Sequence, residues 1–249
     1  MPALRYALWV AVPLLQLTIV VRMLYRRMQR EFPAFFTYMA FHAVRSLLLI
    51  GLRSWPGTPY RVYFYSFWVS ECLGAALGIA VAYEIYQQIF TSYPGLQRLG
   101  RLMFHGCASV MVLVAVWAGA SSSAPGFARV VSSLLVLSMG SMVVRVGLIG
   151  FLFAFASTLR LTWRHYAFGI AMGLGLYTSV ELAASAANLV LGSALTMTHQ
   201  VIRSAAYNCA LLVWLSSLLK REAIGVEAPS VSGAELTQWN NVLAEFLGR

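Results

Sequence analysis

The 249-residue chain contains no aspartate and a single lysine, Lys220. Only 10% of its residues are charged, against about 25% in an ordinary soluble domain, whereas 60% are hydrophobic. So little polar surface cannot coat a water-soluble globule of this size. These shortages exclude a soluble enzyme, a nucleic-acid-binding module and a disordered tail protein, in spite of a net charge of +10.

Motifs for catalysis and metal binding are lacking as well. The three cysteines, Cys72, Cys107 and Cys209, lie in apolar runs without CxxC spacing. Neither H-E-x-x-H nor G-x-S-x-G occurs, and the last apolar run has no central lysine for a retinal Schiff base. We therefore expect no cofactor and no metal. The alternative to this expectation is a haem group held between His42 and His105.

Seven long apolar runs are the main feature of the sequence. They cover residues 6–25, 35–52, 62–83, 102–120, 130–155, 167–191 and 201–219. A helical bilayer span needs about 20 mostly apolar residues, and a barrel strand would be shorter and alternate apolar with polar residues. An arginine cluster follows the first run. We therefore interpret this run as a membrane anchor that is retained and not as a signal peptide that is cleaved. The predicted fold is all-α, a seven-transmembrane-helix bundle over residues 1–221.

The basic residues predict the orientation of this bundle. With the N-terminus outside, the inner segments hold ten arginines and lysines and the outer segments hold four. Loops that stay in the cytoplasm are enriched in these residues. The bias favours an N-out, C-in topology.

Residues 222–249 are predicted to form a cytoplasmic tail with an amphipathic helix from about residue 233. Ser232 and Glu235 have the spacing of a capping box, and apolar residues then recur at helical spacing from Leu236 to Leu247. The tail is too short for an effector domain. We expect its helix to lie on the bilayer or on the inner helix ends, or else to bind a protein partner or a sister subunit.

Five ionisable residues interrupt the apolar runs: Arg45, Glu71, Arg145, Glu181 and Arg203. Each would cost about 2.5–3.5 kcal/mol at a helix centre facing lipid, so all should point into the bundle. Matching depths predict an Arg45–Glu71 pair and an Arg145–Glu181 pair. Arg203, nearer the outer end, should be satisfied by Glu71 or by water.

Polar neighbours extend these positions into stripes along the helices. His42 shares a helix face with Arg45, and Tyr177 shares one with Glu181. A structural polar core and a ligand or ion site both explain such stripes. The candidate site is therefore the network of the five charged residues with His42 and Tyr177.

Two further contacts are predicted from spacing. Glu84, at the inner end of the third run, should reach Arg98 or Arg101 across the following loop. Close helix contacts are expected at two G-x-x-x-G spacings, formed by Gly74 with Gly78 and by Gly169 with Gly173.

Several stretches carry a resemblance to known proteins. They are YFYSFWVSE at 63–71, AYEIY at 82–86, YPGL at 93–96, WN at 239–240 and EFL at 245–247. In these the chain resembles a group of uncharacterised bacterial seven-helix membrane proteins. The resemblance implies a multi-pass protein of the bacterial inner membrane and brings no activity with it. In size and topology the chain is also similar to the seven-helix sensor modules that precede bacterial kinases.

Three functions remain open on the sequence. The leading one is a non-enzymatic receptor-like protein, or a subunit of a membrane complex, that uses the Arg/Glu network for a ligand or for structure and its tail for contacts inside the cell. The second is a small-solute or proton-coupled carrier, with Glu71 and Glu181 as protonatable sites. The third is a lipid-modifying enzyme. The expected partners are the lipid bilayer and a protein or second copy, and no nucleic acid.

Overall fold

The computed structural model is all-helical over the residues that it describes, which are 2–55, 57, 59–90, 94–121, 127–158, 165–191 and 196–219. Its helices are α1 (Pro2–Tyr25), α2 (Pro33–Ser54), α3 (Tyr60–Ile89), α4 (Pro94–Ser121), α5 (Phe127–Thr158), α6 (His165–Leu191) and α7 (Thr196–Leu219), with a 3₁₀ turn η1 (Met28–Arg30) after α1. Each predicted run lies within one helix, and the all-α prediction is confirmed. The predicted tail, 222–249, lies outside the described residues.

The chain is a multi-pass membrane protein. Among the residues that the structure describes, five segments are long and apolar enough to cross a bilayer: Pro33–Ser54, Tyr60–Ile89, Val136–Ala154, Tyr166–Ala187 and Gln200–Leu219. Val10–Tyr25 adds a shorter apolar segment. Large apolar side chains such as Leu14, Val69 and Leu212 are exposed on the outside of the bundle, where lipid would cover them.

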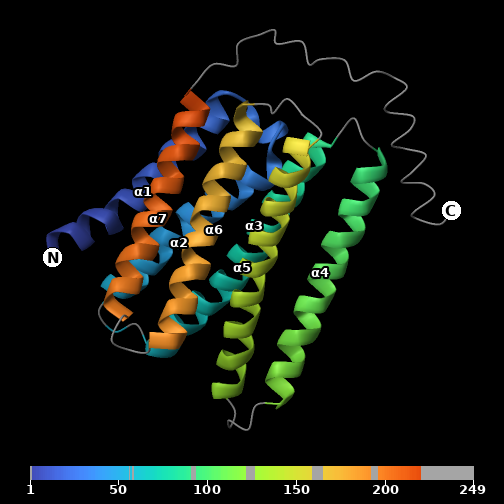
Figure 1. Cartoon of the computed structure of the whole chain (residues 1–249). Coiled ribbons are helices and arrows are strands. Elements are labelled where there is room, and N and C mark those ends of the chain that lie inside the picture. The colour runs from blue at the N-terminus through green and yellow to red at the C-terminus, as the bar shows by residue number, and fades with distance from the viewer. Residues whose placement is uncertain are drawn as a thin grey trace, which may run out of the picture.

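Successive helices run in alternating directions, so the bundle has two ends (Figure 1). We call them the Tyr25 end, where α1 stops and α2 begins, and the Ser54 end, where α2 stops and α3 begins. Helix α4 lies at the side of the bundle and, within the described part of the chain, packs only on α3 and α5. The other six helices surround the interior.

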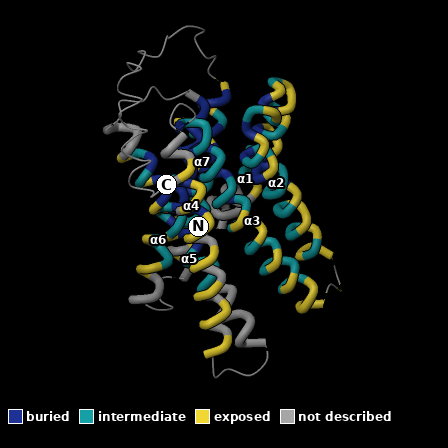
Figure 2. Tube along the Cα trace, turned by 90° about the vertical axis from the view of Figure 1, so that its right-hand side faces the viewer, coloured by how far each residue is buried: buried dark blue, intermediate teal, exposed yellow. Residues whose placement is uncertain are grey.

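The tightly packed core occupies the half of the bundle toward the Tyr25 end, as the dark blue segments of Figure 2 show. Among the described side chains, Ala43 is the last buried residue of α2 and Gly74 is the first of α3. Burial ends at Glu181 on α6 and begins at Ala206 on α7. Toward the Ser54 end, every side chain of these helices that the structure describes is half-buried or exposed, so the helices are less closely packed there.

Trp214 is the largest residue of this core and is fully buried. Its ring meets Phe35 edge-on with centroids 5.4 Å apart and meets Tyr38 in the same way at 6.3 Å. The indole N–H donates a hydrogen bond of 3.1 Å to the carbonyl of Ile170 on α6. Buried aromatic contacts with a satisfied N–H fix the α2–α6–α7 packing.

The glycines singled out by their spacing do lie at close helix contacts. Each one is covered by a side chain from a neighbouring helix: Gly74 by His42, Gly78 by Arg145, Gly169 by Ser217 and Gly173 by Trp214. A Cβ atom at any of these positions would collide with that side chain or press against it. The glycines of α3 therefore make room for two of the polar residues predicted for the site.

Glu84 stabilises the start of α2 and does not bind the arginines predicted for it. Its two carboxylate oxygens accept the backbone N–H groups of Ala34 (2.8 Å) and Phe35 (2.9 Å), and no ion pair with Arg98 or Arg101 forms in the described structure. The first N–H groups of a helix lack partners within the helix, and Phe32 at the N-cap supplies none. A carboxylate from α3 takes that place and also favours the helix dipole.

Replacing Glu84 by alanine is expected to lower the free energy of unfolding by about 1–2 kcal/mol, because two partly buried N–H groups lose their acceptor. Glu84→Gln keeps one amide oxygen as an acceptor and should lose less. Unfolding by SDS in mixed micelles, followed by circular dichroism, measures both changes. Equal losses in the two variants, or no loss in either, would contradict the capping role.

Candidate functional site

The five charged residues predicted for the site lie on five different helices near the level at which tight packing ends. Arg45 is on α2, Glu71 on α3, Arg145 on α5, Glu181 on α6 and Arg203 on α7. Glu71 is 11 residues beyond the first residue of α3, which is about 16 Å along the helix from the Ser54 end. This polar centre, defined by the five residues, contains the ion pairs described next.

Glu71 binds two arginines at once. Its Oε2 accepts a 2.5 Å hydrogen bond from Nη2 of Arg45, and its Oε1 accepts one of 3.2 Å from Nη2 of Arg203. The predicted Arg45–Glu71 pair is therefore present, and so is the predicted contact of Arg203 with Glu71. The guanidinium of Arg45 also lies 5.5 Å from the ring centre of Phe67, in cation–π contact.

The predicted Arg145–Glu181 pair is wrong. Glu181, whose side chain is only 2% exposed, instead places its Oε1 atom 2.6 Å from Nη2 of Arg203. Nothing among the described residues pairs Arg145 with a carboxylate. Arg203 thus bridges Glu71 and Glu181, and the four residues from Arg45 to Glu181 form one continuous chain of charges.

The packing of α6 on α7 explains this choice. Gly173 lies under the ring of Trp214, and the two helices run in opposite directions. Glu181 lies eight residues beyond Gly173 on α6. An equal distance back along α7 from Trp214 reaches the turn that contains Arg203. Consecutive antiparallel helices are usually neighbours, so α6 could place Glu181 against an arginine of α5 or of α7. Because α6 packs more closely on α7 than on α5, Glu181 pairs with the arginine of α7.

Arg145 is buried, with 5% of its surface exposed, and its hydrogen-bond partners within the described part of the chain are neutral. Its Nε donates to the carbonyl of Ser141 (3.2 Å) and its Nη2 to the Ser141 hydroxyl (3.4 Å). The guanidinium lies against Gly78 of α3. The polar centre therefore holds three guanidinium groups and two carboxylates, an excess of one positive charge.

His42 and Tyr177, the other two predicted site residues, both lie beside the charges. The His42 ring lies 4.4 Å from that of Tyr38, and its buried Nε2 has no hydrogen-bond partner among the described residues. The Tyr177 ring meets Tyr207 at 4.9 Å. The Tyr207 ring in turn lies 6.2 Å from that of His42. The structure brings all seven predicted residues to one region.

Two neutral polar residues of this region, Gln16 and Ser46, were missed by the sequence reasoning. Gln16 of α1 is 1% exposed; its Nε2 donates to the Tyr207 hydroxyl (2.9 Å) and its Oε1 accepts from the Ser46 hydroxyl (3.1 Å). A count of charged residues does not find such groups. The available signal was that Gln16 is the only amide side chain in the apolar run 6–25.

The haem alternative is not supported by the geometry. His105 is exposed on α4, with Nδ1 2.7 Å from the carbonyl oxygen of Arg101, whereas His42 lies in the interior on α2. Helices α2 and α4 do not pack on each other in the described structure. Within the same residues, no three His, Cys, Asp or Glu side chains gather in a way that could hold a metal ion.

The polar centre is most accessible at Arg203. Its side chain is 36% exposed, more than that of Arg45, Glu71 or Glu181. Because tight packing ends at this level, an approaching molecule would reach the centre from the Ser54 end. Chemically, the centre can bind a polar or anionic group and can exchange one ion pair for another.

Comparison of the chain with protein-family models, with curated proteins and with solved structures finds no match.

Proposed function

We propose that the protein is a non-enzymatic, receptor-like membrane protein that holds a small ligand with an anionic group at the polar centre. The observation that carries this proposal is Arg145, a buried guanidinium with no carboxylate partner among the described residues. It lies beside two carboxylates that already pair with Arg45 and Arg203. A buried charge without a counter-ion is costly, and intramembrane charges commonly mark binding sites. An anionic ligand would supply the missing negative charge.

The proposed topology gives the ligand its route. Seven spans with the N-terminus outside and the tail inside place the Ser54 end on the outer face, and the bias of ten basic residues to four supports that orientation. The ligand would then enter from outside and meet Arg203 first. The tail, on the opposite side of a bacterial inner membrane, would contact a partner or a sister subunit.

Ligand binding is tested by thermal unfolding of the purified chain in detergent with acetate, succinate, glutamate and inorganic phosphate. A ligand at 100 times its dissociation constant should stabilise the protein by about 2.7 kcal/mol. We expect Arg145→Gln to abolish that stabilisation and Arg61→Gln, a change at an exposed arginine of α3, to preserve it. If none of the four anions stabilises the protein, or if Arg145→Gln responds as the wild type does, the anion-binding role is wrong.

A carrier is the second candidate, and the shared position of Arg203 favours it. Oε1 of Glu181 is 2.6 Å from Arg203 but accepts no hydrogen bond, whereas Glu71 accepts one from the same nitrogen. An arginine that can pass between two carboxylates is suited to a transport cycle. A carrier would show solute or proton uptake into liposomes that Glu181→Gln abolishes, whereas a receptor requires no flux.

A further inference from the structure

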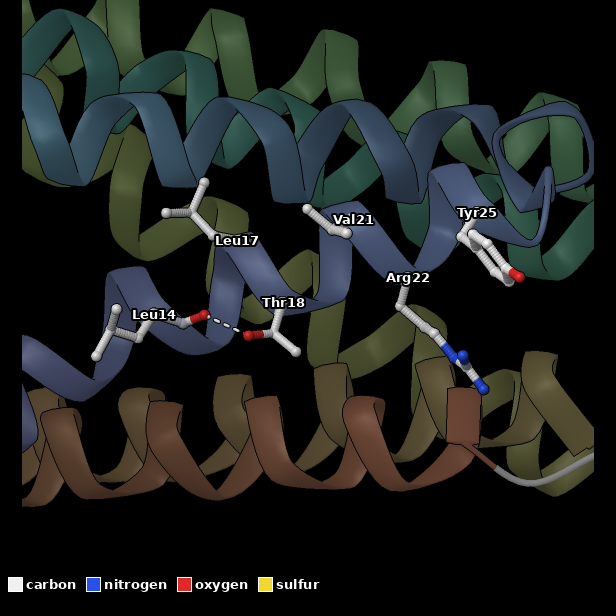
Figure 3. Close-up of a pocket in the computed structure, with 6 residues that line it drawn as sticks. All are labelled: Leu14, Leu17, Thr18, Val21, Arg22 and Tyr25. Atoms are coloured by element: carbon white, nitrogen blue, oxygen red, sulfur yellow. Dashed lines mark hydrogen bonds between the residues drawn. The ribbon is translucent and has the colours of Figure 1, made fainter.

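A second feature, separate from the polar centre, is a groove of about 540 Å³ on the outward face of α1 (Figure 3). Helix α1 packs between α2 and α7, and the groove follows the face of α1 that neither neighbour covers. Its lining residues recur every three or four positions, as one face of a helix requires. They are Leu14, Leu17, Thr18, Val21, Arg22 and Tyr25.

The groove changes character along its length. Leu14, Leu17 and Val21 are exposed apolar residues that form its walls toward the middle of the bundle. Arg22 and Tyr25 lie at the Tyr25 end, where Figure 3 shows Arg22 pointing toward the last turn of α7. From Leu14 to Arg22 the helix rises about 12 Å, which fits within one leaflet of a hydrocarbon core about 30 Å thick.

Arg22, one of the residues that line the groove, has an unused hydrogen-bonding group. Its Nε is buried and has no hydrogen-bond partner, and no carboxylate of the described chain pairs with it. Arg27 and Arg30 follow in the turn after α1 and are exposed, so positive charge gathers where the helix leaves the bilayer. A buried donor without an acceptor is unfavourable unless a ligand supplies the acceptor.

We propose that this groove binds an anionic phospholipid, with an acyl chain on Leu14, Leu17 and Val21 and the phosphate on Arg22. The combination of an apolar wall and a cationic end matches the two parts of such a lipid. A free phosphate would leave the wall uncovered. A second copy related by a two-fold axis along the membrane normal would bring two Arg22 side chains to the same level, where their charges repel.

The test uses the full chain in detergent with phosphatidylglycerol or phosphatidylcholine of identical acyl chains, and native mass spectrometry counts the bound lipid. We expect about fivefold tighter binding of phosphatidylglycerol, the contribution of one arginine near the headgroups. Arg22→Gln should remove this preference, and Arg61→Gln, at the other end of the bundle, should keep it. Val21→Trp should weaken binding of both lipids, whereas Val69→Trp, on the exposed face of α3, should not.

Four outcomes would overturn the proposal. Equal binding of the two lipids would make the groove an ordinary lipid-facing surface, and so would a preference that survives Arg22→Gln. Displacement of phosphatidylglycerol by inorganic phosphate would indicate a site for a free anion. A dimer that dissociates on Val21→Trp would indicate that a second copy occupies the groove. None of these results depends on the polar centre, because Arg22 belongs to none of its three ion pairs.

Discussion

Glu71→Gln is expected to lower the free energy of unfolding by about 3–5 kcal/mol, the usual cost of removing one partner from a buried ion pair. Glu71 serves two guanidinium groups, and both it and Arg45 are largely buried. With the carboxylate gone, Arg45 keeps no carboxylate partner in the described structure, whereas Arg203 still has Glu181. The loss arises mainly from the charge left behind on Arg45.

Glu181→Gln is the internal comparison and should cost less. Arg203 would retain Glu71, and because its side chain is more than a third exposed, solvent would screen what remains. The double variant Arg45→Gln/Glu71→Gln should recover at least half of the loss of Glu71→Gln, since the guanidinium that loses its carboxylate partner is removed together with it. Reversible unfolding in micelles of fixed composition measures all four proteins. Equal losses for Glu71→Gln and Glu181→Gln, or a double variant no better than Glu71→Gln, would contradict this account.

The Arg45–Glu71 pair was predictable because little freedom remains between the helices that carry it. The loop from Ser54 to Tyr60 is short, so α2 and α3 must lie side by side in opposite directions. Counting residues from that loop then gives nearly the same depth for both charges. The same reasoning correctly placed His42 and Tyr177 in the interior, because their faces are those of Arg45 and Glu181.

The partner of Glu181 could not be predicted in this way. Helix α6 has an antiparallel neighbour on each side, and depth alone does not distinguish Arg145 from Arg203. The choice depends on how Trp214 fits over Gly173, which is a matter of side-chain shape. A spacing of small residues predicts that two helices approach closely, but it does not say which helix is the partner or which side chain fills the gap.

Glu84 was misplaced for a related reason. A search among charged residues offers arginines as partners, whereas the structure uses two uncharged N–H groups at the start of α2. Gln16 escaped notice because it, too, binds neutral partners. Charge identifies which residues must avoid lipid. Backbone and hydroxyl groups then provide many of the hydrogen-bond partners that these residues have in the interior.

Gly173→Leu is expected to cost about 3–4 kcal/mol, the sum of overpacking a close contact and of breaking a buried hydrogen bond. A side chain at position 173 would occupy the space of the Trp214 indole. The indole would have to leave its contacts with Phe35 and Tyr38 and release the carbonyl of Ile170. Thermal unfolding in detergent measures the loss.

Gly147→Leu on α5 is the matched control, because nothing lies within 4 Å of where its Cβ would be, and it should change stability by no more than about 0.5 kcal/mol. The contact at Gly173 also sets the level at which Glu181 meets Arg203. Gly173→Leu should therefore make Glu181→Gln less costly when the two changes are combined, since an ion pair already separated cannot be lost again. Strict additivity of the two losses would show that the Trp214 contact and the polar centre are independent, and that α6–α7 packing does not select the partner of Glu181.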